Sequence, residues 1–94
     1  MFDIKLVGDD KVLLEGRFDA SRTALANTIL DKLAVTTTID MSRLEYISSA
    51  GLGALIAARQ RLAGQGGKLV ISGANHHVMH VMKLARLDLI FEFM

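Results

Sequence analysis

Two adjacent serines, Ser48 and Ser49, stand where an apolar helix is expected to begin. A serine at a helix start is usually a cap, because its oxygen accepts one of the N–H groups that the first turn leaves unpaired. Here two serines lie side by side, and Gly51 and Gly53 follow closely, so the helix start carries little side-chain cover. This arrangement suits a hydroxyl that is presented to the active site of another protein.

The chemistry that such a hydroxyl could support is reversible phosphorylation. A phosphoserine carries about −1.5 to −2 charges. A helix N-terminus offers about half a positive charge and free N–H donors, so a phosphate there is tolerated without refolding. A partner fitted against the neutral helix start would have to bury that charge unpaired, and its binding should therefore fail.

The elements that must position these serines follow from hydrophobic periodicity and turn residues. A glycine and two aspartates at 8–10 predict a turn between the first two strands, and residues 42–47 are interpreted as a link. We expect strands at residues 4–7, 12–18, 35–41, 68–72 and 89–93, and helices at residues 22–33, 49–63 and 76–87.

Each expected helix has one apolar face that can pack on a sheet. The residues predicted to point inward are Leu25, Ala26, Ile29, Leu30 and Leu33 in the first helix, Leu52, Leu55, Ile56 and Leu62 in the second, and Val78, Val81, Met82 and Ala85 in the third. Beside Ser49, a smooth face of small residues is expected from Gly53, Ala54, Ala57 and Ala58.

The order of these elements predicts an α/β fold: one domain with a mixed β-sheet that is largely parallel after an N-terminal hairpin. A chain of 94 residues suits a single domain. Hydrophobic residues make up 51% and charged residues 22%, which is typical of a compact globular protein.

Composition argues against several other classes of protein. The chain has no cysteine, which excludes disulfides and thiol catalysis. The net charge is +1 and the charges are scattered, so no nucleic acid is expected as a partner. No apolar run is long enough to span a membrane and no signal peptide is evident, so we expect a cytoplasmic protein.

No enzyme site, metal or cofactor is expected from the remaining motifs. His76, His77 and His80 are interpreted as a solvated helix face, because no cysteine and no obvious third ligand accompany them. The glycines around Leu52 and those at 64–67 lack the spacing or the context of nucleotide-binding loops.

The segment Ile39–Leu55 resembles the phosphorylation-site region of the anti-sigma factor antagonists, which are bacterial STAS-domain proteins. The family pattern is Asp-x-Ser, four residues, then Ile-Asp-Ser-Ser/Thr-Gly-Leu before an apolar helix. Two positions depart from it, since Ser48 replaces the aspartate and Ala50 replaces the second Ser/Thr. The residues that match are Asp40, Ser42, Ile47, Ser49, Gly51 and Leu52, and Gly16–Asp19 resembles the end of the family's second strand.

The resemblance implies that residues 1–94 are a STAS domain lacking the usual C-terminal helix. It implies a binding module that is not an enzyme: the unphosphorylated form binds a serine kinase that doubles as an anti-sigma factor, and so releases a sigma factor. Phosphorylation of Ser49, or alternatively of Ser48, ends the association, and a PPM-type serine phosphatase reverses it.

The expected partner surface surrounds this serine at one edge of the sheet. Asp40 is expected to orient the serine hydroxyl or a phosphate-bound metal in the kinase complex, with turn and cap chemistry as the alternative for it and for Asp19. The predicted partner-binding residues are Asp19, Asp40, Ser42, Ser48, Ala50, Gly51, Leu52, Gly53, Ala54 and Ala57.

The sequence is also compatible with two other functions. One is a STAS scaffold in another partner-switching or stress-signalling pathway. Another is a small-ligand or transport-associated STAS domain, which would need an apolar pocket. We also expect self-association as a homodimer through the C-terminal end, because Phe91 and Phe93 share one strand face and Ile90 the other.

Overall fold

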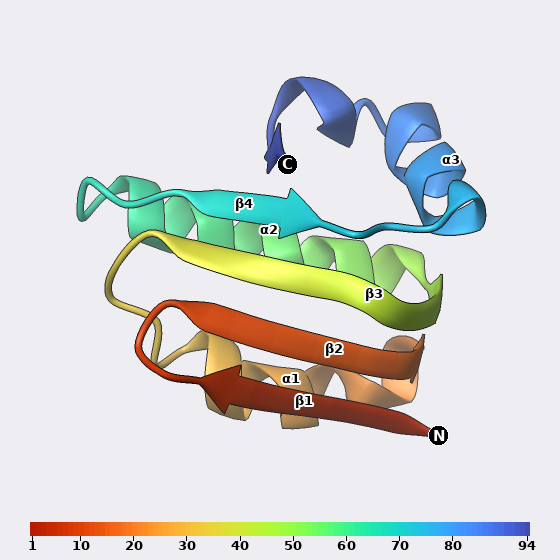
Figure 1. Ribbon diagram of the computed structural model, residues 1–94, viewed down its shortest axis with the longest axis horizontal. Coiled ribbons are helices and arrows are strands. Elements are labelled where there is room, and N and C mark those ends of the chain that lie inside the picture. The colour runs from red at the N-terminus through yellow and green to blue at the C-terminus, as the bar shows by residue number, and fades with distance from the viewer.

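The computed structural model describes residues 1–94 as a five-stranded sheet with three α-helices and two short 3₁₀ helices (Figure 1). The strands are β1 (Phe2–Val7), β2 (Lys11–Phe18), β3 (Thr37–Ile47), β4 (Leu69–Ser72) and β5 (Glu92–Phe93). The helices are η1 (Ala20–Arg22), α1 (Thr23–Leu30), α2 (Ser49–Ala63), α3 (His76–Leu84) and η2 (Leu87–Leu89).

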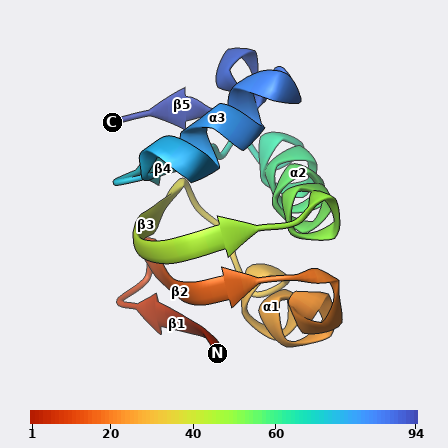
Figure 2. The same ribbon diagram turned by 90° about the vertical axis from the view of Figure 1, so that its right-hand side faces the viewer.

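The sheet has the strand order β1-β2-β3-β4-β5, with β1 antiparallel to β2 and every other pair parallel. This confirms the predicted mixed sheet after an N-terminal hairpin, whose turn uses the left-handed conformation of Gly8. Helices α1 and α2 lie together on one face of the sheet (Figure 2). Helix α3 follows β4 and contacts β3.

One hydrophobic core joins the sheet to its helices, and most of the predicted inward positions belong to it. The buried members from the three predicted helices are Ala26, Leu30, Leu33, Leu52, Leu55, Leu62, Val78 and Met82. The predictions for Leu25 and Ala85 are wrong, because both side chains are exposed. Ala85 lies beyond the end of α3 at Leu84, whereas Leu25 lies within α1 (Thr23–Leu30) but outside the face that buries Ala26 and Leu30.

Strand β3 is longer than predicted, since it continues through residues 42–47, which were interpreted as a link. Its pairing with β2 shifts register twice: Leu13 lies opposite Asp40, whereas Glu15 lies opposite Arg43. Each shift adds a residue to β3, as a β-bulge does. The buried residues of β3 are therefore spaced by two and then by three, at Thr37, Ile39, Met41, Leu44 and Ile47, and strict alternation cannot detect such a strand.

The C-terminal segment also differs from its prediction. Arg86 takes a left-handed backbone conformation (φ 60°) after α3, and η2 follows instead of more α-helix. The strand predicted at 89–93 is reduced to Glu92–Phe93, which pairs with β4. Leu89 is 77% exposed and Phe91 is buried, so the segment turns before it joins the sheet.

Candidate functional site at the start of α2

Ser48 is the N-cap of α2. Its Oγ accepts a hydrogen bond from the Gly51 N–H at 3.1 Å, and its own N–H donates to the Phe18 carbonyl at the end of β2 (2.9 Å). The backbone of Ser48 is extended, as the cap position requires. Ser48 therefore has a structural role that joins β2, β3 and α2.

Ser49 is the first residue of α2 and is exposed. Its hydroxyl takes part in no side-chain hydrogen bond, because the capping position is filled by Ser48. The first turn contains no acidic residue. A negative group on Ser49 would therefore meet the positive end of the helix without a carboxylate in the helix's own first turn to repel it.

The small residues that follow Ser49 divide into a buried and an exposed set. Gly51 is buried, and a Cβ placed on it would lie 2.9 Å from Ile47 Cγ1 and 3.1 Å from the Phe18 carbonyl oxygen. Gly51 is thus required by packing against the ends of β2 and β3. Leu52 is buried as well, so neither residue presents a side chain to a partner.

The exposed set forms a surface along one side of α2. Gly53 is exposed, and a Cβ placed on it would meet nothing within 4 Å, so the fold itself does not require glycine there. Ala58, expected on this face, is buried. The small residues in the first half of α2 that remain at least partly accessible are Ser49, Ala50, Gly53, Ala54 and Ala57. We call this set the α2 surface.

Asp19 lies at the same edge of the sheet as Ser48, as predicted, because Phe18 is paired with Ile47. Its Oδ1 accepts hydrogen bonds from the Ser21 hydroxyl (2.6 Å) and the Ser21 N–H (3.1 Å), and so caps η1. The bond from the Ser21 hydroxyl is the main cause that lowers the pKa of Asp19. Its carboxylate therefore stays charged beside the start of α2.

Asp40 and Ser42 do not lie at this edge, and this corrects the predicted site. Asp40 is paired with Leu13 and with Ser72, within β3 and seven residues before Ile47. At about 3.3 Å per residue it lies roughly 20 Å along the strand from the start of α2. Asp40 is therefore too far away to orient the Ser49 hydroxyl or a phosphate on it.

The Asp-x-Ser segment instead stabilises the first bulge of β3. Asp40 Oδ1 accepts a hydrogen bond from the Ser42 N–H (2.9 Å), and its Oδ2 lies 3.6 Å from Lys11 Nζ. Gly73 packs closely on Ser42, since a Cβ on this left-handed glycine would lie 3.1 Å from the Ser42 Cβ. The alternative of turn and cap chemistry is thus the one that the geometry favours for Asp40.

The bond from the Ser42 N–H holds the pKa of Asp40 below its ordinary value of 3.8. A carboxyl whose pKa is lowered by folding stabilises the folded state above its ordinary pKa, and this contribution is lost as the pH falls through the folded-state value. We expect Asp40→Asn to lower the free energy of unfolding by about 1 kcal/mol at neutral pH, because the Asn oxygen can still accept the Ser42 N–H but a neutral hydrogen bond is weaker than one to a charged group.

Urea unfolding across a pH series tests this expectation. The difference between Asp40→Asn and the parent protein should be complete well above pH 3.8 and should shrink as the pH falls below it. Asp9→Asn, which removes the same charge from the exposed hairpin turn, is the matched control and should change little. An equal loss of stability at acidic and neutral pH would contradict the assignment.

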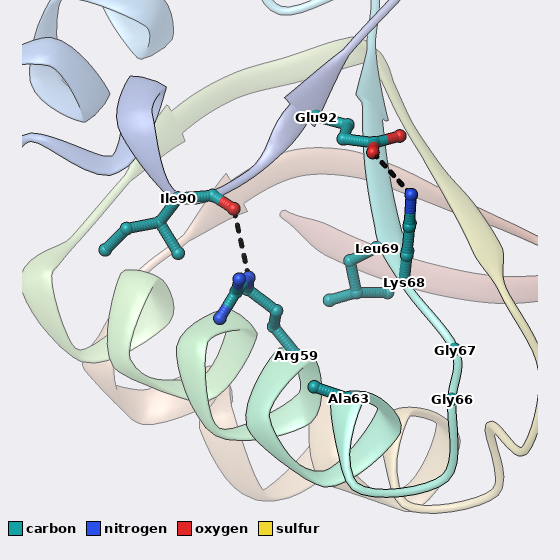
Figure 3. A pocket seen from close by; sticks show the side chains of 8 residues that line it. All are labelled: Arg59, Ala63, Gly66, Gly67, Lys68, Leu69, Ile90 and Glu92. Atoms are coloured by element: carbon teal, nitrogen blue, oxygen red, sulfur yellow. Dashed lines mark hydrogen bonds and ion pairs between the residues drawn. The ribbon is translucent and has the colours of Figure 1, made fainter.

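One pocket of about 320 Å³ lies at the other end of α2, between Arg59, the turn after the helix, and the segment before β5 (Figure 3). Arg59 Nε donates to the Ile90 carbonyl (3.0 Å), and Lys68 Nζ lies 2.9 Å from Glu92 Oε1. These charged side chains line the pocket together with Gly66 and Gly67. Ala63, Leu69 and Ile90 complete the lining, so the pocket has a mixed polar and apolar character.

A stack of three side chains from three elements was not foreseen from the sequence. The Arg17 guanidinium lies 4.4 Å from the centroid of the Tyr46 ring, and the His77 ring stacks on Tyr46 at 6.2 Å. His77 therefore contacts the sheet. No group of three His, Asp or Glu side chains is arranged to share a metal ion. No helix has both the length and the apolar character needed to cross a membrane.

The molecule is thus a small two-layer α/β domain with an exposed serine at the start of the helix that follows its third strand. The sequence model of one family, described as "Mlab, STAS domain", matches residues 5–92. The chain belongs to this STAS-domain family, whose members are generally binding modules without enzymatic activity.

Solved structures show the same fold. TM1081 of Thermotoga maritima superposes with a TM-score of 0.80 at 24% identity, covering 98% of this chain and 84% of that protein. The unphosphorylated anti-sigma factor antagonist SpoIIAA gives 0.72 at 14% identity, with 100% and 87% of the two chains covered. Phosphorylated SpoIIAA of Bacillus gives 0.65 at 17% identity, with 100% and 91% covered.

Proposed function

We propose that this protein is a phosphorylation-controlled binding module of a partner switch. In its unphosphorylated form it binds a serine kinase that is also an anti-sigma factor, and the sigma factor is released. Transfer of a phosphoryl group from ATP to Ser49 ends the association, and a PPM-type phosphatase restores it. The chain itself is the substrate of both enzymes and catalyses neither step.

The observation that carries this proposal is that the two serines have different structural roles. Ser48 is half-buried and its Oγ is occupied by the Gly51 N–H, whereas Ser49 is exposed and its hydroxyl is unbonded. A kinase needs an accessible nucleophilic oxygen, and phosphorylation of Ser48 would break the cap. The geometry therefore favours Ser49 as the acceptor over Ser48.

Relatives of the same fold support the class of partner. SpoIIAA, which shares this fold, is an anti-sigma factor antagonist and occurs in unphosphorylated and phosphorylated forms. In the present chain the α2 surface, with Gly53 and Ala57 one and two turns after Ser49, would let a partner approach the helix backbone closely. Asp19 lies at the same edge and would add a charged contact.

An in vitro phosphorylation assay tests the proposal, with the candidate serine kinase encoded by the same organism and intact-mass spectrometry as the readout. We expect one phosphate on the parent protein and on Ser48→Ala, and none on Ser49→Ala. A phosphate lost only in Ser48→Ala would move the acceptor by one residue. No phosphate on the parent protein with an active kinase would overturn the switch.

The departures at Ser48 and Ala50 from the anti-sigma factor antagonist pattern favour one alternative above the others, a STAS scaffold in another partner-switching or stress-signalling pathway. In that case the cognate kinase would phosphorylate Ser49 but would bind no sigma factor. A pull-down of sigma factors by the purified kinase separates the two outcomes.

A further inference from the structure

Strand β1 forms one edge of the sheet, and no other element covers this edge (Figures 1 and 2). The Arg17 N–H donates to the Met1 carbonyl across the β1–β2 ladder. Because alternate residues of an antiparallel strand face the same neighbour, the backbone groups of Phe2, Ile4 and Leu6 point to the free edge. The Ile4 N–H accordingly bonds to the Asp3 carboxylate (2.9 Å) and not to β2.

The side chains of this edge strand have a twofold pattern. Residues 2–6 read apolar, acidic, apolar, basic, apolar, with Ile4 at the centre. If a second copy pairs antiparallel about Ile4, Asp3 of each copy lies opposite Lys5 of the other. In this register the outward backbone groups of both strands also meet as hydrogen-bonded pairs, because residues 2, 4 and 6 face 6, 4 and 2.

We propose that β1 pairs with β1 of a second copy of this chain, and that two molecules thereby form one continuous sheet. The charge complementarity of Asp3 and Lys5 selects the partner and the register. Shifting the strands by two residues in either direction would separate both charge pairs, and parallel pairing in register would place like charges opposite each other. The proposed contact does not involve Ser49 and goes beyond the proposed function.

The structure of the single chain also indicates what pairing would change. Lys5 Nζ lies 3.7 Å from Asp3 Oδ2 of its own chain, and both side chains are largely exposed. Association would replace two intrachain pairs, one in each copy, by two pairs between chains, and would free the Ile4 N–H of each copy from Asp3. Leu6 is 39% exposed and would meet Phe2 of the second copy. Because existing contacts must be released, the dimer should be reversible and dependent on concentration.

Sedimentation equilibrium of the full chain, with Asp3→Lys and Lys5→Asp, tests the pairing. The parent protein should dimerise, and each variant alone should dimerise about tenfold or more weakly, because like charges then face each other in both pairs. An equimolar mixture of the two variants should recover the dimer, since a strand with two lysines then faces a strand with two aspartates. Circular dichroism should show that both variants are folded.

Three results would overturn the proposal. One is a parent protein that stays monomeric up to about 1 mM, where even a weak dimer is populated. Another is a folded single variant that dimerises as strongly as the parent. The last is a mixture that stays monomeric. Leu89→Ser is the control for the exposed C-terminal end; loss of the dimer in this variant alone would assign self-association to that end instead.

Discussion

Ser49→Asp is expected to weaken binding to the cognate serine kinase by about 100-fold or more, which corresponds to about 2.7 kcal/mol. The added carboxylate lies at the start of α2, where the helix itself tolerates it. A partner seated on the α2 surface would have to remove its water without supplying a counter-charge, which costs several kcal/mol. Ser49→Ala, which stays neutral and small, should bind like the parent protein. Isothermal titration calorimetry measures both.

The matched control for this experiment places the same charge elsewhere on the molecule. Gln65 is exposed in the turn after α2, at the other end of the helix from Ser49. Gln65→Glu should leave the affinity unchanged, so that a loss seen only with Ser49→Asp is a local effect. Undiminished binding of Ser49→Asp, in a protein that unfolds normally, would contradict a switch based on charge at this position.

The two glycines at the start of α2 are expected to respond to substitution in opposite directions. Gly51→Val should lower the free energy of unfolding by about 2–3 kcal/mol, because its side chain would overfill the space beside Ile47 and Phe18. Gly53→Ala should raise it by about 0.5–1 kcal/mol, since alanine is the better helix former and the added methyl meets open space. Urea denaturation of both variants provides the measurement.

Binding separates the role of Gly53 from its effect on stability. If the partner approaches the α2 surface closely, the added methyl of Gly53→Ala should weaken binding to the kinase in a protein that has become more stable. Unchanged affinity in Gly53→Ala would show that the partner does not approach this part of the helix. A stabilising effect of Gly51→Val would instead contradict the close packing of Gly51.

Several elements were predictable because local and long-range signals agree. Helix α2 begins at Ser49 and ends at Ala63, as the serines before it and the glycines after it predict. The β1–β2 hairpin was predicted for the same reason, with a left-handed glycine in its turn. In these segments the residues that begin or end an element also fit its burial pattern, so the fold does not override local preference.

Strand β3 and the position of Asp40 were not predictable, and both errors have one cause. The two added residues of β3 exist only in relation to β2, because a bulge is a property of a strand pair. Read alone, the three-residue spacing of Met41, Leu44 and Ile47 does not look like a strand. Once residues 42–47 are taken for a link, Asp40 appears to end a strand, and the site seems to include it.

The start of α2 was predicted in position, whereas Asp40 and Ser42 were wrongly expected beside it. The sequence places two serines at a helix start, and only the hydrogen bond to Gly51 assigns the cap to Ser48. The stacked side chains of Arg17, Tyr46 and His77 come from β2, β3 and α3, so no local sequence pattern predicts their contact. What the partner recognises depends also on the chemistry of the partner, which this sequence does not contain.

The bulges of β3 bear on how sequences of this kind can change in length. In a regular strand, the loss or gain of one residue turns every following side chain to the other face of the sheet. At a bulge, one residue is already unpaired, so the number of residues can change there while those that follow keep their faces. Single-residue insertions and deletions upstream of Ser49 should therefore be tolerated best at the two register shifts, and gaps in alignments with relatives should collect there.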